Sequence, residues 1–238
     1  MNKTVLLAAA AAFAMCAGGA SAAPTHLTAA VSGAKVNPVF HRAKGATVLW
    51  NQNSNGSGEF VNSQNFTSGT YATYDDQSAD DFVVPTGTVW KVTEVDVTGE
   101  YRSTGNAASE NVFFYKNKGN GKKSMPGKQV AEVMNVVGTD TSGSFAISLG
   151  KKGVKLKAGH YWISVVANLD FLSSDNEWYW ENTANTIQGS SGEWQNPGGG
   201  FASCLSWGTL NDCVKTSGGT GVANADFMFE LQGKAKTS

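Results

Sequence analysis

Charge, proline and histidine are all scarce in this sequence. Of the 238 residues, 16% are charged, five are proline and three are histidine, and the formal net charge is −1. So sparse and balanced a charge argues against a nucleic-acid partner, because phosphate binding requires a basic surface. The lack of proline argues against a stiff linker between domains. The length therefore favours one large domain.

Recognised catalytic motifs are also lacking. The sequence contains no Gly-x-Ser-x-Gly elbow, no phosphate-binding loop and no His-Glu-x-x-His pair. His26, His41 and His160 stand in no motif that also holds a nucleophile and an acid. These absences favour a protein that is not an enzyme. A glycoside hydrolase remains an alternative, because such enzymes use scattered carboxylates.

Only the first 22 residues carry a long apolar run. Lys3 precedes the run Val5 to Ala17, and Ala20-Ser21-Ala22 has the small side chains that a signal peptidase accepts. The run is too short to cross a ~30 Å hydrocarbon core. We therefore expect a signal peptide over residues 1–22 and a secreted mature protein, extracellular or periplasmic, with no transmembrane segment. A lipoprotein with Cys16 as the lipidated residue is the alternative.

The rest of the chain shows strand patterns in place of helical ones. Apolar residues alternate with polar ones at period two, as in Phe145, Ile147 and Leu149, and glycine-rich turns recur every ten to fifteen residues. This pattern predicts an all-β fold, an antiparallel β-sandwich of jelly-roll-like type. We expect a flexible arm over 23–46, a single sandwich domain over 47–233, a tail over 234–238 and a monomer. The expected strands are 47–50, 79–85, 89–101, 111–115, 129–137, 144–149, 154–157, 160–167 and 225–231.

Two cysteines remain after removal of the signal peptide. Cys204 and Cys213 are an even pair in a chain bound for an oxidising compartment, which predicts a disulfide bond. Closing so small a loop stabilises a protein by roughly 2–3 kcal/mol in the chain-entropy model. Two free thiols are the alternative.

Four aspartates gather within seven positions. Asp75, Asp76, Asp80 and Asp81 are oxygen ligands of the kind that calcium takes in secreted sandwiches. Their spacing does not match the EF-hand loop. The alternative is that these carboxylates accept hydrogen bonds from nearby backbone N–H groups. Calcium is the one cofactor that the sequence suggests.

Aromatic residues concentrate between residues 175 and 207. Trp178, Trp180, Trp194 and Trp207 are candidate contacts for a ligand, because exposed aromatic rings stack on the faces of sugars. Strand alternation would place Trp178 and Trp180 on one face, so core packing is the alternative. A catalytic pair drawn from Glu177, Glu181 and Glu193 is a third interpretation.

Several motifs resemble those of a group of exported bacterial proteins whose role is unassigned. The likeness rests on Gln-x-Ala-Asp-Asp-Phe-x-Val-Pro at 77–85, Gly-x-Tyr-Trp-x-Ser-Val at 159–165 and Trp-x-Asn-Pro-Gly-Gly-Gly-Phe at 194–201. The cysteine pair and Asp226-Phe227-Met228-Phe229 complete it. The resemblance covers residues 47–233 and implies a secreted β domain. It implies no catalytic residue, and the absence of a hydrophobic sorting tail favours release over anchoring.

The sequence thus predicts a secreted, non-enzymatic binding module. Its expected ligand is a polysaccharide or another cell-surface ligand, contacted by the four tryptophans between residues 175 and 207. A structural matrix or envelope protein without a small ligand is the main alternative.

Overall fold

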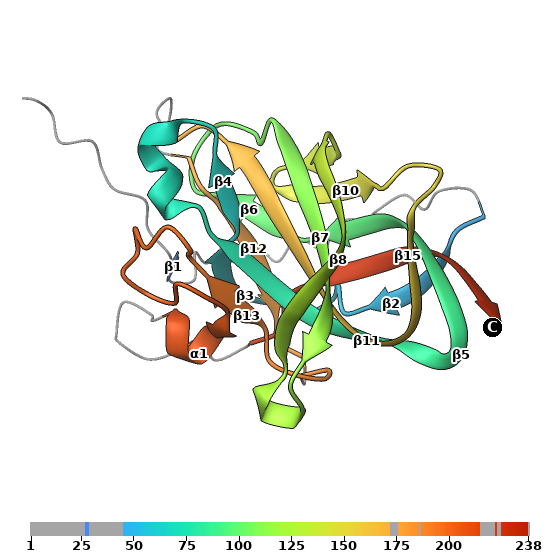
Figure 1. The fold of residues 1–238 in the computed structure, drawn as a ribbon. Coiled ribbons are helices and arrows are strands. Elements are labelled where there is room, and N and C mark those ends of the chain that lie inside the picture. The colour runs from blue at the N-terminus through green and yellow to red at the C-terminus, as the bar shows by residue number, and fades with distance from the viewer. Residues whose placement is uncertain are drawn as a thin grey trace, which may run out of the picture.

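Two packed antiparallel sheets make up the structure, a computed structural model that describes residues 27–28, 45–171, 176–185, 187–214, 222 and 225–237 (Figure 1). The predicted all-β sandwich is confirmed, with 60% strand and 7% helix. The signal peptide and most of the N-terminal arm lie outside the described residues. No helix in the described ranges is long and apolar enough to cross a membrane.

The smaller sheet, sheet A, has the strand order β1-β3-β12-β6 within the described residues. Its strands are β1 (Leu27–Thr28), β3 (Gly56–Asn62), β12 (Trp178–Thr183) and β6 (Gly99–Tyr101).

The larger sheet, sheet B, runs in the order β14-β13-β5-β11-β7-β8 over its described part, and further strands pair at its margins. The strands along this path are β14 (Gly208–Thr209), β13 (Glu193–Gln195), β5 (Gln77–Val97), β11 (Val154–Leu169), β7 (Ser109–Lys118) and β8 (Met125–Val136). The marginal strands are β2 (Thr47–Asn51), β4 (Gln64–Phe66), β9 (Thr139–Thr141), β10 (Ser144–Ser148) and β15 (Phe229–Thr237). Short helical turns are η1 (Gly69–Tyr74), η2 (Gly121–Lys123) and α1 (Leu210–Cys213).

Two long strands, β5 and β11, run through the middle of sheet B. The sequence predicts that Pro85 ends a strand, because proline has no N–H for the ladder. In the structure β5 continues to Val97, and its ladder with β11 skips from Val84 to Val89. The neighbouring strand β11 bulges at the same level, between Lys157 and Gly159. Since no ladder bond is required there, the proline interrupts the pairing without ending the strand.

The main core fills the space between the two sheets. Trp178 and Trp180 point into it from sheet A, and Phe227 and Phe229 meet them from the last strand and the residues before it. Both indole N–H groups are satisfied: Trp178 Nε1 donates to the carbonyl of Gly143 at 2.7 Å, and Trp180 Nε1 donates to that of Met228 at 2.8 Å. The closing strand expected over 225–231 begins only at Phe229 in the structure, but Phe227, Phe229 and Leu231 are buried as predicted.

The segment from residue 51 to residue 74 differs most from its prediction. The sequence suggested a loop over 51–58 and mainly loop over 59–74, because neither stretch has a clean period. The structure places β3, β4 and η1 there. Pairing with a distant strand explains why β4 forms, because β4 runs parallel to β11 with Ala167 opposite Gln64. The last strand also extends to Thr237, beyond the expected boundary at residue 233.

Candidate ligand-binding site

Sheet B carries a second group of packed side chains on the face turned away from the main core. Phe113, Tyr115, Trp162 and Val166 form this group together with Ala79, and Trp207 packs against it. Strand alternation explains their common face, because Trp162 lies opposite Tyr115 in the β11–β7 ladder. This outer face of sheet B therefore has an aromatic surface of its own.

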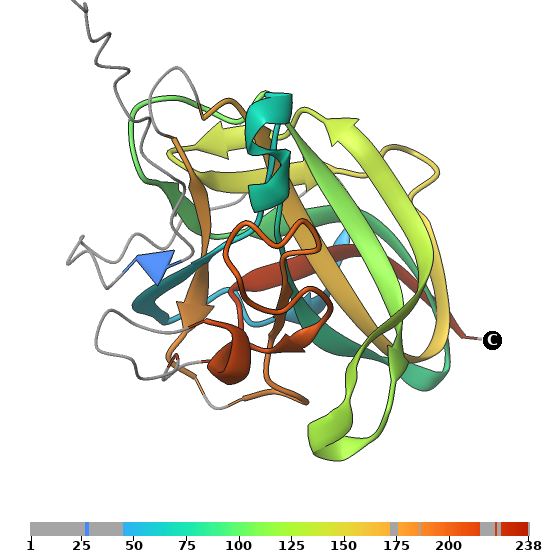
Figure 2. The ribbon, with the colours of Figure 1, turned by 60° about the vertical axis from the view of Figure 1, so that its left-hand side comes forward.

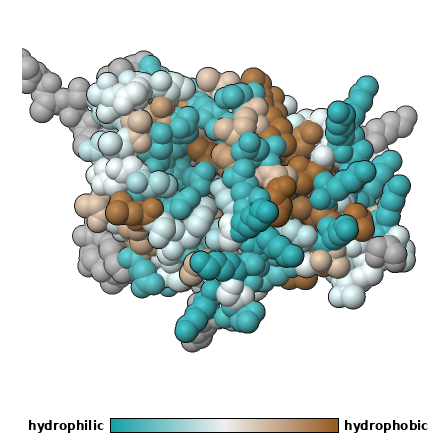
Figure 3. All heavy atoms as spheres, in the orientation of Figure 1, coloured by the Kyte–Doolittle hydropathy of each residue, from teal (hydrophilic) through white to brown (hydrophobic). Residues whose placement is uncertain are grey.

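A cavity of about 380 Å³ lies over part of this outer face. We call it the trough. Strands β5, β7 and β11 form its floor, and β8, η1 and the loop after β13 border it. Figure 2 shows how these elements are arranged. On the face of the molecule drawn in Figure 3, which has the orientation of Figure 1, patches of apolar residues are interspersed among polar ones. The lining residues are Gln64, Asn65, Ala72, Asp75, Asp76, Gln77, Asn111, Phe113, Met134, Val166, Gln195, Pro197 and Gly198.

Side-chain amides dominate the polar lining of the trough. Gln195 lies opposite Gln77 in the β13–β5 ladder, and Gln195 Nε2 donates to Gln77 Oε1 at 2.8 Å. Gln77 Oε1 also accepts from the Tyr115 hydroxyl at 3.3 Å. Gln77 Nε2 and Gln195 Oε1, the other ends of these amides, make no hydrogen bond within the described residues. The two amides are thus held in place, and their other ends, Gln77 Nε2 and Gln195 Oε1, can still form hydrogen bonds with a ligand.

A second amide network lies along one side of the trough. Asn168 exchanges two hydrogen bonds with Asn111, at 2.8 and 3.0 Å, and Asn168 Oδ1 also accepts from Asn65 Nδ2 at 3.0 Å. Asn111 Oδ1 further accepts from the backbone N–H of Asn135 on β8 at 2.9 Å. These bonds connect β4, β7, β8 and β11, so the network fixes the positions of both Asn65 and Asn111 in the lining.

Two consecutive carboxyl groups close one end of the trough. Asp75 Oδ1 accepts from the backbone N–H of Phe66 at 2.8 Å, and Asp76 Oδ1 accepts from that of Gln64 at 3.2 Å. Burial raises the pKa of Asp75 to about 6, and full burial raises the pKa of Asp76 well above its usual value. Asp76 Oδ2 is buried and has no partner within the described residues. At the end of the trough, burial therefore favours the neutral form of the Asp76 carboxyl group.

The loop after β13 forms the wall of the trough facing η1. The buried side chain of Asn196 donates to the carbonyls of Thr73 and Asp75, both at 2.8 Å, and its Oδ1 accepts from the N–H of Phe201. A Cβ atom at Gly198 would lie 2.7 Å from Thr73 Cα, so only glycine permits this approach. The Asn-Pro-Gly-Gly-Gly-Phe run is therefore the sequence that docks this loop onto η1.

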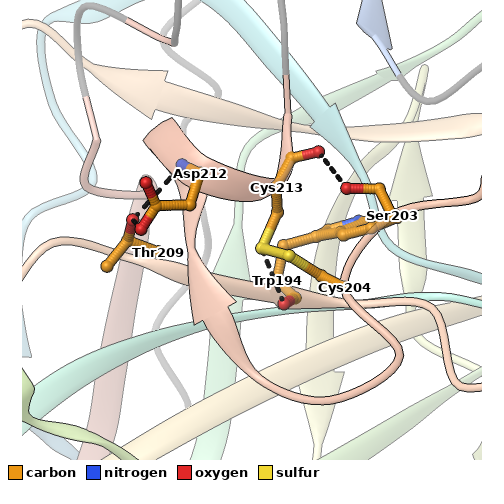
Figure 4. The surroundings of a disulfide bond; sticks show 6 residues. All are labelled: Trp194, Ser203, Cys204, Thr209, Asp212 and Cys213. Atoms are coloured by element: carbon orange, nitrogen blue, oxygen red, sulfur yellow. Dashed lines mark hydrogen bonds between the residues drawn. A yellow bond between two sulfur atoms is a disulfide. The ribbon is translucent and has the colours of Figure 1, made fainter.

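A disulfide bond between Cys204 and Cys213 anchors the far end of the same loop (Figure 4). The predicted pairing is confirmed. Ser203 Oγ donates to the carbonyl of Cys213 at 2.7 Å, and Cys213 Sγ lies 3.6 Å from the carbonyl oxygen of Trp194. The covalent bond thus ties the loop to α1 and to β13, which also carries Gln195.

Three of the four tryptophans proposed as ligand contacts are in the interior. Trp178, Trp180 and Trp194 each have 0% of their surface exposed, so their ring faces are not accessible to a sugar. The ligand-platform interpretation is wrong for these three, because strand alternation turns them toward the core. Trp207 is only half-buried, and it packs edge-on against Tyr115 on the outer face, with ring centroids 5.6 Å apart.

The four clustered aspartates do not converge on one point. Asp75 and Asp76 line the trough, whereas Asp80 accepts from Gln52 and from the N–H of Phe227, both at 2.6 Å. Asp81 contacts His160 and accepts from the N–H of Ser190. No group of three or more ligating side chains that could hold a metal occurs among the described residues. Each aspartate accepts a backbone N–H, as the capping alternative predicts.

The three candidate catalytic glutamates are divided between the two sheets. Glu177 is buried next to sheet A, where it pairs with Arg102 at 2.5 Å and accepts from the Tyr179 hydroxyl. Glu181 lies on β12 of sheet A, and Glu193 lies on β13 of sheet B. Neither Glu177 nor Glu181 lines the trough.

Sequence reasoning missed the amides that line the trough. Gln64, Gln77, Asn111 and Gln195 lie far apart along the chain, and only the pairing of distant strands brings them together. The available signal was the polar residue at alternate positions of otherwise apolar strands, as at Asn111 and Asn168. Comparison with protein-family models, with curated proteins and with solved structures finds no match to this chain.

Proposed function

We propose that this protein is a secreted, non-enzymatic binding module whose trough takes a neutral polysaccharide. The observation that carries the proposal is the lining of the trough. It combines an apolar floor, fixed side-chain amides and a buried carboxyl group with one oxygen that has no partner among the described residues. Sugars need both kinds of surface, because their C–H faces pack on apolar groups while their hydroxyls exchange hydrogen bonds with amides and carboxyls.

The charge of the lining selects among polysaccharides. No lysine, arginine or histidine is among the described residues that line the trough, and Asp75 and Asp76 are its ionisable groups. Burial favours the neutral form of Asp76, since it raises the pKa of this carboxyl group. An anionic polymer would find no cation to pair with, so a neutral polymer is the better ligand.

The rigidity of the trough also supports a binding role. Gln77, Gln195, Asn65 and Asn111 are each held by hydrogen bonds to neighbouring side chains. Side chains that are already ordered lose little conformational entropy when a ligand binds. The fixed amides therefore favour recognition of a defined arrangement of hydroxyl groups.

A matched pair of glutamine variants tests the proposal. Gln195→Ala removes an amide from the trough, whereas Gln129→Ala removes an exposed amide from β8 outside it. Binding of the mature protein to a panel of neutral soluble polysaccharides, including β-glucans, xyloglucan and mannan, is measured by isothermal titration calorimetry and by affinity electrophoresis. We expect one polymer to bind, with at least tenfold weaker binding in Gln195→Ala and unchanged binding in Gln129→Ala.

The opposite results favour the structural alternative. If no neutral polymer binds, or if both variants bind equally well, the trough is not a carbohydrate site and a matrix or envelope role is the better account. Release of reducing sugar from a bound polymer would instead show a hydrolase and would contradict the non-enzymatic part of the proposal.

A further inference from the structure

A second cavity, of about 480 Å³, lies beside the trough on the same side of sheet B. Strand β13 separates the two, because Gln195 lines the trough and Glu193, two residues earlier, lines the second cavity. The tip of the β7–β8 hairpin contributes Gly121 and Ser124 to its wall. Residues 187–193 and the start of α1 complete the wall.

Glu193 is the one carboxyl group among the described residues that line this cavity. Its residue surface is 2% exposed, and its Oε2 atom is buried without a hydrogen-bond partner within the described residues. Burial raises the pKa of Glu193 to about 7, and the negative charge of Asp212 acts in the same direction. A buried carboxyl oxygen without a partner is costly, so a ligand that supplies donors and positive charge would stabilise it.

The remaining polar groups around Glu193 are mostly oxygens. Ser124, Ser190 and Ser191 place hydroxyl groups in the wall, and no lysine, arginine or histidine is among its described lining residues. An ammonium group has three N–H donors and no acceptor, so it matches one carboxylate surrounded by hydroxyl oxygens. A phosphate or a carboxylate would be repelled by Glu193 and Asp212.

Hydrogen bonds from backbone N–H groups hold the wall that carries these hydroxyl groups. The N–H of Ser190 donates to Asp81 Oδ2 at 3.0 Å, and the N–H of Gly192 donates to the carbonyl of Ala225 at 2.6 Å. A Cβ atom at Gly189 would lie 2.4 Å from Asp81 Oδ1, and the φ of Gly189 is +96°. Asp81 itself is fixed by its contact with His160. Hydrogen bonds and close packing thus fix this wall of the cavity in place.

We propose that this cavity binds the primary ammonium group of an amino sugar, with Glu193 as the ion-pair partner and Ser190 and Ser191 as hydrogen-bond acceptors. The proposal goes beyond the carbohydrate role of the trough, because it concerns a separate cavity and a charged group that the trough is not built to bind.

The test is a set of titrations followed by backbone amide chemical shifts in nuclear magnetic resonance. The probes are glucosamine, glucose and N-acetylglucosamine, which differ at one carbon, and ethanolamine, which carries the amine without the sugar ring. We expect glucosamine to shift the amides of residues 189–193, with ethanolamine giving smaller shifts there. Glucose and N-acetylglucosamine should leave these amides unchanged at the same concentration.

Glu193→Gln removes the charge and keeps the shape, and Glu132→Gln makes the same change on the exposed part of β8. Glucosamine should bind at least tenfold more weakly to Glu193→Gln and equally well to Glu132→Gln. Ser190→Ala keeps the backbone hydrogen bond to Asp81 and should weaken glucosamine binding several-fold. This variant takes the place of Glu193→Gln if Glu193→Gln does not fold.

Absence of shifts at 189–193 with glucosamine, equal shifts with glucose, or unchanged affinity in Glu193→Gln would each overturn the proposal. Stronger binding of ethanolamine than of glucosamine would show an aliphatic amine site and would overturn the amino-sugar assignment. The trough is monitored in the same spectra through the amides of residues 64–65 and 75–77. Its response to neutral polysaccharide is therefore scored separately, and either proposal can fail without the other.

Discussion

Both faces of sheet B carry buried side chains, but the two faces differ in composition. On β11 the side chains of Tyr161, Ile163 and Val165 point into the main core, whereas Trp162 and Ser164 point to the outer face. The inner face packs against sheet A with apolar groups, as a sandwich core requires. The outer face mixes aromatic rings with amides and carboxyls and is hollowed by two cavities. A buried aromatic residue on the inner face therefore contributes to stability, whereas one on the outer face marks a candidate binding surface.

A matched pair of tryptophan variants should show the largest difference between the faces. Trp180 is fully buried in the main core, and Trp207 is half-buried on the outer face. Trp180→Ala should lower the free energy of unfolding by about 3–5 kcal/mol, because it leaves a large cavity. Trp207→Ala should lower it by about 1 kcal/mol, in the range of ordinary substitutions. Urea denaturation measures both, and equal losses would mean that the outer face carries as much packing energy as the core.

A pair of glycine variants tests how the loop after β13 is held against η1 to form a wall of the trough. A methyl group at Gly198 would meet the backbone of Thr73 at 2.7 Å, whereas a Cβ atom at Gly69 would meet nothing within 4 Å. Gly198→Ala should therefore cost about 1–3 kcal/mol of stability, as overpacking does. Gly69→Ala should change stability little, and only Gly198→Ala should weaken polysaccharide binding in the trough. Thermal melting and calorimetry check both effects, and a neutral Gly198→Ala would show that the loop does not need its close contact with η1.

The smallest expected effect is a dependence of stability on pH that arises on the outer face. Below pH 4.5 Glu193 is protonated in both the folded and the unfolded chain. As the pH rises, the unfolded chain ionises first, because burial raises the pKa of Glu193 to about 7 in the folded protein. The Glu193 contribution therefore lowers stability between about pH 4.5 and 7 and levels off above that range.

Melting temperatures at pH 5 and pH 8 measure this dependence. Glu193→Gln should lose less stability across the interval than the unchanged protein, and Glu132→Gln should lose as much. Part of the dependence should persist in Glu193→Gln, because burial also raises the pKa of Glu110 and of Asp226 to about 7. Identical curves for the unchanged protein and Glu193→Gln would show that Glu193 is not a buried carboxyl group in the folded state.

Strand alternation predicted much of the fold, and it also predicted which face several residues take. Trp178 and Trp180 share a face as the period of two requires, and Phe227, Phe229 and Leu231 line the core as expected. The period does not say whether a shared face is exposed. Exposure depends on what another strand places over it, and this is why the ligand-platform interpretation failed for Trp178, Trp180 and Trp194.

The candidate sites were less predictable than the fold. Asp75 and Asp76 were singled out for calcium, and the structure places them at the end of the trough. Their proximity to Gln195 follows from the β13–β5 ladder, which joins positions 118 residues apart. Glu193 was noted as one possible catalytic acid. Its burial beside the serine hydroxyls became visible only once residues 187–193 were seen next to the hairpin tip.

The sequence by itself determined the class of fold, the disulfide pair and the alternation of faces along the long strands. These features depend on local backbone geometry, on the number of cysteines and on the period of side chains. Only the tertiary structure decided which faces are covered and which polar side chains meet in the trough and beside Glu193. The physical reason is that sheet register brings together residues from distant parts of the chain, and a single amide or carboxyl group gives no sign of its partners until the strands are paired.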